Sequence, residues 1–122
     1  MATTHQIYIE PHALVIGLPD EHLALCHEVM GDAGLRVDVL RTGIALAAAC
    51  EKIPKALPQM VVASAALGPD ALDALEDRAI AVGAVFLLLG DRPDYESMGR
   101  QLETGVALAR ERFGRRSSPP PS

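Results

Sequence analysis

A single serine stands where a buried segment of the chain runs out into a loop. The residues MVVA, Met60 to Ala63, form a continuously apolar run, and Ser64 follows them directly. Such a run is typical of a strand covered on both faces, and open parallel sheets bind ligands at the carboxyl ends of their strands. A serine hydroxyl is a weak nucleophile without a neighbouring base. Hydrolysis would require His12 or His22 to reach Ser64, and there is no nucleophile-elbow motif, so we predict that the chain is not an enzyme.

The segment EHLALCHE contains two histidines and a cysteine, which are types of residue that bind metal ions. His22 and Cys26 are separated by one helical turn, so both could contact the same ion. Cys26 falls on the apolar stripe of a predicted helix, whereas His27 lies on another side. Two ligands do not complete a site. We therefore predict buried free thiols at Cys26 and Cys50, surface histidines, and neither a metal nor a cofactor.

Short apolar runs alternate with amphipathic segments along the chain. Continuous apolar runs predict strands, and apolar residues at helical spacing, started by Pro or Thr and ended by Gly or Pro, predict helices. Strands are expected over residues 12–17, 35–40, 59–64 and 84–90. Helices are expected from Pro19 to Gly34, from Thr42 to Pro54, from Pro69 to Gly83, and from Pro93 through Phe113.

This alternation predicts a doubly wound α/β sandwich with a mostly parallel sheet and helices on both faces. The 122 residues suffice for one hydrophobic core. We assign residues 1–114 to a single domain. Residues 115–122, rich in Ser and Pro, are expected to form a disordered tail or a linker.

Composition narrows the classes of partner. The net charge is −5 and aromatic residues make up 3% of the chain, which argues against nucleic acid binding except through a fused domain. The basic segment RERFGRR, residues 110–116, is interpreted as a solvated helix end, with a nucleic acid or lipid contact as the alternative. No apolar run is long enough to span a bilayer and the N-terminus is not a secretory signal, so a cytoplasmic protein with no membrane contact is expected.

The order, length and spacing of the elements from His12 to Gly90 resemble the receiver domain of bacterial response regulators, a flavodoxin-like signalling module. In that family an acidic pair after the first strand binds Mg²⁺, an aspartate ending the third strand accepts phosphate, and a hydroxyl residue ends the fourth. The corresponding positions here hold Gly17 and Leu18, Ser64, and Gly90. The fifth strand, with its Lys-Pro, is missing or replaced. Phosphoryl transfer needs Mg²⁺ and its carboxylate ligands, so the resemblance implies a receiver that has lost this chemistry.

We therefore expect a pseudo-receiver: a non-catalytic, phosphorylation-independent module for protein binding or dimerisation in bacterial signalling. The alternative is an α/β domain that binds a small anion or a nucleotide over the loops at Gly17, Ser64 and Gly90. Those loops lack the spacing of a dinucleotide-binding or P-loop motif.

Loss of the fifth strand would leave the fourth, AVFLLL, at the edge of the sheet, where an apolar strand invites pairing with another chain. Residues 7–10 or 91–98 could supply a covering strand. We predict an interaction face for a protein partner or a second copy, a homodimer being favoured, or else a last helix that simply closes the core. Gly99 and Gly105 indicate close packing of that helix. The predicted face consists of Phe86, Leu88, Tyr95, Met98, Leu102 and Val106.

Overall fold

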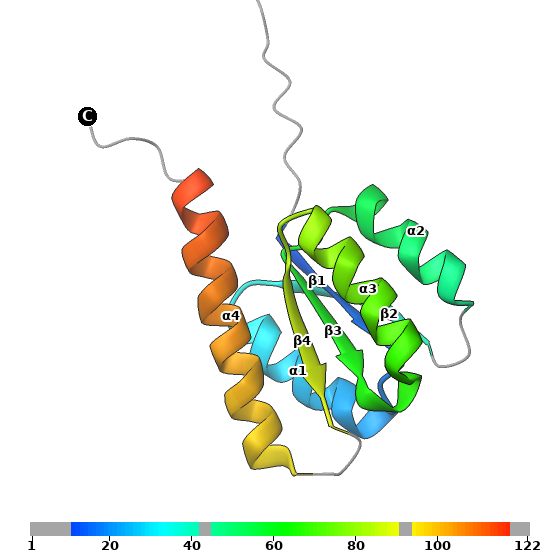
Figure 1. The fold of residues 1–122 in the computed structure, drawn as a ribbon. Helices are drawn as coiled ribbons and strands as arrows, with labels where there is room; N and C mark the ends of the chain where they lie inside the picture. The colour runs from blue at the N-terminus through cyan, green and yellow to red at the C-terminus, as the bar shows by residue number, and fades with distance from the viewer. Residues whose placement is uncertain (1–10, 42–44, 91–93, 118–122) are drawn as a thin grey trace, which may run out of the picture.

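The computed structural model describes residues 11–41, 45–90 and 94–117, with side chains up to Arg112. Strands and helices alternate along the chain, as Figure 1 shows. The elements are β1 (His12–Ile16), α1 (Asp20–Asp32), β2 (Arg36–Leu40), α2 (Leu46–Ala56), β3 (Met60–Ser64), a 3₁₀ turn η1 (Ala65–Leu67), α3 (Pro69–Ala81), β4 (Val85–Leu89) and α4 (Tyr95–Ser117).

The four strands form one parallel sheet in the order β2-β1-β3-β4. The chain moves from β1 to β2 in one direction and from β2 past β1 to β3 and β4 in the other. Right-handed crossovers therefore place α1 on one face and α2 and α3 on the opposite face. The predicted doubly wound α/β fold is confirmed, and β4 lies at an edge of the sheet as expected.

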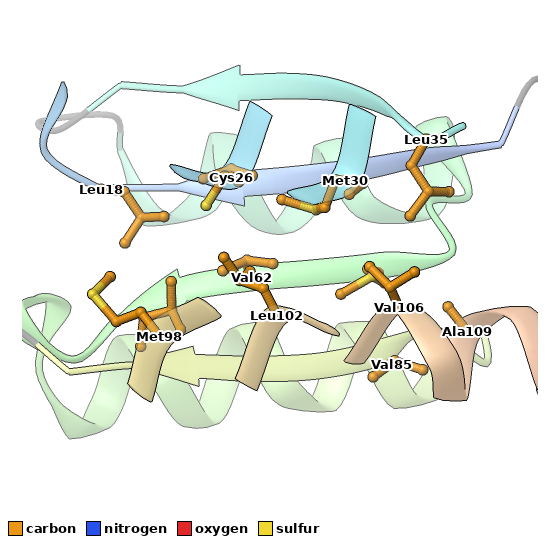
Figure 2. Close-up of a cluster of buried hydrophobic side chains, with 14 residues drawn as sticks. Leu18, Cys26, Met30, Leu35, Val62, Val85, Met98, Leu102, Val106 and Ala109 are labelled. Atoms are coloured by element: carbon orange, nitrogen blue, oxygen red, sulfur yellow. The ribbon is translucent and has the colours of Figure 1, made fainter. Parts of the chain in front are cut away.

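The face of the sheet that bears α1 is also covered by α4, which has no strand after it in the described part of the chain. Cys26 and Met30 of α1 and Leu102 of α4 meet over Val62 of β3 (Figure 2). Because α4 packs against both α1 and β4, its apolar stripe closes the core. This core layer consists of Ala13, Val15, Leu18, Cys26, Met30, Leu35, Met60, Val62, Val85, Leu89, Met98, Leu102, Val106 and Ala109.

The opposite face is closed by α2 and α3. Leu14 and Ile16 of β1 alternate with the residues that face α1 and α4, so both faces of β1 are buried, which accounts for its continuous apolar sequence. The edge strand β2 is only partly buried, as its alternating sequence predicts. This second layer consists of Leu14, Ile16, Ala49, Cys50, Ile53, Val61, Ala63, Leu75, Ala79 and Ala84.

The second helix differs from its prediction at both ends. It begins at Leu46 and continues through Pro54 to Ala56, and Leu46, which helical spacing predicts on the buried face with Ala49 and Ile53, is exposed. A proline inside a helix removes one hydrogen bond, but Ile53 next to it is fully buried and holds this turn against the sheet. Leu57 then ends the helix in the left-handed conformation, its amide donating to the Ile53 carbonyl. Thr42, the predicted cap, lies outside the described residues.

The last helix begins at Tyr95 and ends at Ser117, past residue 114, where the tail was predicted to begin. Residues 95–98 are helical, so no covering strand is formed there, and residues 7–10 lie outside the described residues. Of its two glycines, only Gly105 fits the predicted close packing: a Cβ there would lie 2.8 Å from Met60 Cε and 3.4 Å from Leu87 Cδ2. A Cβ at Gly99 would meet nothing within 4 Å, so that part of the prediction is wrong.

Within the described ranges, none of the helices is both long and apolar enough to cross a membrane.

Candidate functional site

The carboxyl end of the sheet brings together the positions that the resemblance to a receiver assigned to a phosphorylation site. Ile16 pairs with Ala63 across β1 and β3, so Gly17 lies beside Ser64, and Ser64 pairs with Leu89 at the end of β4. Gly90 follows one residue further on and is exposed. The three loops at Gly17, Ser64 and Gly90 therefore lie together at the carboxyl end of the sheet.

The hydroxyl of Ser64 has a local structural role. Ser64 is 2% exposed, and its Oγ accepts a hydrogen bond of 3.2 Å from the Ala66 amide, which caps the η1 turn. His12, one of the two bases that hydrolysis would need, begins β1 at the opposite end of the sheet. A buried hydroxyl that caps a turn is poorly placed to act as a nucleophile.

The position next to Ser64 is covered by an apolar side chain. Gly17 has φ +72°, and a Cβ built on it would lie 2.8 Å from Cδ2 of Leu67. Leu67 belongs to η1 and packs on the core layer beneath α2 and α3. Leu18, the other half of the missing acidic pair, is buried in the opposite layer. The two positions that the receiver resemblance assigns to the acidic pair therefore carry no carboxylate, and apolar side chains pack there.

Of the two carboxylates nearest in sequence to the end of β1, Glu21 is bonded to Tyr95 and Asp20 lines a cavity with Leu18 and Arg41. Asp20 and Glu21 form the first turn of α1, and Glu21 Oε2 accepts a hydrogen bond of 3.3 Å from the Tyr95 hydroxyl. Partial burial and the Glu21 charge raise the pKa of Tyr95. This contact ties the start of α4 to the start of α1.

His22 is 3% exposed, so the prediction of a surface histidine there is wrong; His27 is exposed as predicted. The His22 ring meets the Tyr95 ring edge-on, with their centroids 6.2 Å apart. Its burial follows from α4, whose first turn covers that side of α1, a contact that helical periodicity within α1 could not reveal. Among the described residues, no three His, Cys, Asp or Glu side chains lie close enough together to hold a metal ion.

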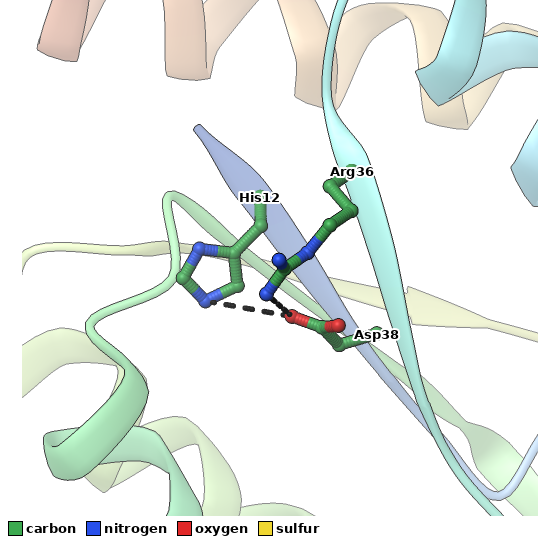
Figure 3. A network of polar contacts seen from close by, with 3 residues as sticks. All are labelled: His12, Arg36 and Asp38. Carbon is green, nitrogen blue, oxygen red and sulfur yellow. Dashed lines mark hydrogen bonds and ion pairs between the residues drawn. The ribbon is translucent and has the colours of Figure 1, made fainter. Parts of the chain in front are cut away.

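At the other end of the sheet, polar side chains of β1 and β2 form a small network (Figure 3). Asp38 Oδ2 lies 3.1 Å from Arg36 Nη2 and 3.9 Å from Nε2 of the buried His12. Together with Lys52 of α2 these residues line a cleft of about 390 Å³ beside the exposed edge of β2. Because the Asp38 carboxylate is already shared by two cation-forming groups, we interpret the network as one that fixes β2 to β1.

Both cysteines are free and buried, as predicted. Burial raises the pKa of the Cys26 thiol from 9.0 to about 11. We therefore expect Cys26 to resist alkylation at pH 8 in the folded protein and to react fully in urea, because the thiolate is the reactive form.

The same shift predicts how stability depends on pH. Between about pH 9 and 11 the unfolded thiol has lost its proton while the folded Cys26 thiol keeps it, so the free energy of unfolding should be constant below pH 9 and fall above it. Urea denaturation of the native chain and of Cys26→Ala at pH 7, 9 and 10.5 measures this. An equally steep fall in Cys26→Ala would assign the dependence to other groups and contradict the prediction.

The predicted interaction face divides into a buried and an exposed part. Met98, Leu102 and Val106 are buried in the core between α4 and α1, so these three cannot contact a partner, and the last helix closes the core as the alternative interpretation had it. Leu88 is 44% exposed, Tyr95 is exposed, and Phe86 is partly buried against α3. Helical spacing correctly grouped the α4 residues on one face, but it did not show that α1 covers that face.

The outer edge of β4 exposes main-chain groups at alternate residues. The Val85 amide donates to the Gln59 carbonyl at 2.9 Å, so Val85, Leu87 and Leu89 direct their main-chain groups toward β3. The groups of Phe86 and Leu88 consequently point outward, and within the described residues β3 is the only strand paired with β4. Figure 1 shows this edge next to α4, with no described element lying across it.

At the amino end of the same edge, the main-chain groups are already hydrogen-bonded. Arg112 of α4 donates through Nη1 to the carbonyls of Gly83 and Ala84, at 3.1 and 3.3 Å, and the Ala84 amide donates to the Ala79 carbonyl. Arg110 likewise donates to the carbonyl of Ala33, the residue that follows α1. The basic segment therefore includes two arginines that hold α4 in place, rather than only a solvated helix end.

Comparison with known proteins finds similarity in structure alone. The chain matches no protein-family model and no curated protein sequence. Among solved structures it is similar to the signal receiver domain of a putative Luxo repressor protein from Vibrio parahaemolyticus, with a TM-score of 0.55 and 14% identity over 89% of this chain and 99% of that one.

Two designed proteins are also similar. A de novo designed Rossmann 2x2 fold gives a TM-score of 0.51 with 13% identity over 79% of this chain and 86% of the design. A designed Rossmann 2x3 fold gives 0.50 with 11% identity over 91% and 94%. At these identities the comparisons show the fold: a flavodoxin-like, receiver-like α/β sandwich.

Two residues that shape these sites were not singled out from the sequence. In the sequence, Leu67 lies between a predicted strand and a predicted helix, and only the tertiary structure shows that it covers Gly17. Arg112 reads as one charge among several near the C-terminus. The available signal was its spacing, three residues after Ala109 and seven after Gly105, which places it near the face that packs on the sheet.

Proposed function

We propose that this chain is a non-catalytic, phosphorylation-independent pseudo-receiver that acts by binding a protein across the open edge of β4. The observation that carries the proposal is the edge itself: an apolar edge strand with outward main-chain groups at Phe86 and Leu88 and a Leu88 side chain that is 44% exposed. Natural proteins normally cover or charge such an edge, because it adds strands from other chains.

The carboxyl end of the sheet supports the non-catalytic part of the proposal. The Ser64 hydroxyl accepts a hydrogen bond from the Ala66 amide, Leu67 covers Gly17, and Glu21 is bonded to Tyr95. A phosphorylated receiver needs carboxylates, Mg²⁺ and a free acceptor at this place. The same features argue against the alternative, a small anion or nucleotide held over the Gly17, Ser64 and Gly90 loops.

The test is capture of binding proteins from a lysate of the source cells by the tagged chain, by Leu88→Lys and by Leu57→Lys. Leu57 is also 44% exposed but follows α2, away from β4, so it is a matched control. We expect proteins captured by the native chain and Leu57→Lys to be lost from Leu88→Lys. Circular dichroism and thermal melting check that each variant is folded.

Capture should not change when acetyl phosphate and Mg²⁺ are added, and intact mass spectrometry should show no phosphate on the chain. Equal capture by Leu88→Lys and the native chain would refute the β4 edge as the binding face. Incorporation of phosphate would refute phosphorylation independence.

A further inference from the structure

Resting on the proposed function, we infer that the edge of β4 is made to pair with the same edge of a second copy of this chain, antiparallel, with Leu87 of each copy on the two-fold axis. Two identical surfaces related by a two-fold axis must be self-complementary. Around an axis perpendicular to the sheet, two edge strands run antiparallel and join the two sheets into one.

The register follows from which main-chain groups remain available. Phe86 and Leu88 are the outward-facing residues of the strand, and a register that pairs Phe86 of one copy with Leu88 of the other uses these two residues in both copies and no residue outside β4. A shift toward the amino end would pair Leu88 with Ala84. Both main-chain groups of Ala84 are already bonded, its amide to Ala79 and its carbonyl to Arg112, so that register is blocked.

The side chains on both sides of the β4 edge also favour a second copy of this chain as its partner. On the α3 side, Phe86 and Leu88 would form two cross-strand pairs with their counterparts, an aromatic–aliphatic arrangement that stabilises antiparallel strands. On the α4 side, Leu108 lies one helical turn before Arg112 and so on the side of α4 that reaches β4, and it is 46% exposed. Apolar side chains therefore flank the edge on both faces, as burial against an identical edge requires.

Repulsion between the acidic α3 helices of the two copies should weaken the dimer, and the salt dependence of dimerisation measures it. The helix α3 packs against β4 and carries exposed carboxylates with a single arginine, Arg78. Pairing of two copies brings two acidic α3 helices closer together, so screening by salt should strengthen the dimer. The exposed carboxylates are those of Asp70, Asp73, Glu76 and Asp77.

The register is tested by disulfide cross-linking of Leu87→Cys, with Leu88→Cys as the matched control. In the proposed register the two Leu87 residues form a non-hydrogen-bonded pair with Cα atoms about 4.5 Å apart, within disulfide range. The two Leu88 residues are diagonal neighbours about 7–8 Å apart, beyond that range. We expect Leu87→Cys to form a reducible dimer on mild oxidation, and Leu88→Cys and the native chain, with its two buried thiols, to form none.

Light scattering on the purified native chain supplies the second readout. We expect a dimer whose dissociation constant falls as salt rises, and a monomer for Leu88→Lys at the same concentration. Two results would overturn the inference. One is a native chain that stays monomeric at about 100-fold the concentration used in the capture experiment. The other is cross-linking of Leu88→Cys in place of Leu87→Cys. If the native chain is monomeric but still captures a partner through Leu88, the proposed function stands and the edge is occupied by a different protein. If Leu88→Lys keeps both dimer formation and partner capture, the inference and the proposed function are both refuted.

Discussion

Replacing Leu102 by alanine is expected to destabilise the protein by about 2–5 kcal/mol, a large part of the about 5–15 kcal/mol that a domain of this size has available. Leu102 lies at the centre of α4 and is fully buried between α1 and the sheet. Removing its side chain deletes buried apolar contacts and leaves a cavity that the neighbouring strands cannot fill. Side chains such as Met98 and Val106 hold the rest of the helix, so the cavity persists.

Urea denaturation followed by circular dichroism measures this loss, and Leu46→Ala provides the control. Leu46 undergoes the same chemical change, but it is exposed at the start of α2, where we expect a change within about 0.5 kcal/mol. A loss at Leu102 no larger than that at Leu46 would contradict the assignment of α4 to the core and would restore its stripe as a docking face.

Replacing Gly17 by alanine is expected to destabilise the protein by about 1–2 kcal/mol through the backbone alone, because φ +72° is unfavourable for a residue with a Cβ. The new Cβ would also lie 2.8 Å from Leu67 Cδ2, so Leu67 must move or leave its place on the core. The measured loss should therefore exceed the backbone cost.

Two further variants separate these contributions. Gly31→Ala, in the interior of α1 with nothing within 4 Å of the new Cβ, should be neutral or slightly stabilising. The double variant Gly17→Ala/Leu67→Ala should lose less stability than the sum of its single changes, because the shorter side chain removes the clash. Additive losses would show that Leu67 does not cover Gly17.

This prediction changes how mutations at the carboxyl end of the sheet are interpreted. A bulky residue at Gly17 would be the obvious probe of a ligand held over the Gly17, Ser64 and Gly90 loops. In the structure such a change disturbs the fold itself, so loss of function at Gly17 would say nothing about a ligand. Ser64→Ala removes only the cap of η1, so it is the less disruptive probe of the carboxyl end of the sheet.

The sequence by itself determined the order of the elements, the parallel sheet and the exposed position of β4. Continuous apolar runs such as Val61 to Ala63 require cover on both faces, and right-handed crossovers supply it with helices on both sides of the sheet. The edge position of β4 followed from the resemblance to a receiver and from the missing fifth strand. The loss of the acidic pair at Gly17 and Leu18 was equally readable, because it depends on residue types alone.

Only the tertiary structure decided what covers each surface. Helical periodicity placed Met98, Leu102 and Val106 on one face, but a stripe that closes a core and a stripe that binds a partner have the same spacing. The covering of Gly17 by Leu67 and the bonds of Arg112 to Gly83 and Ala84 join residues far apart in the chain. Such contacts depend on how helices and strands are placed against one another, which local sequence does not specify.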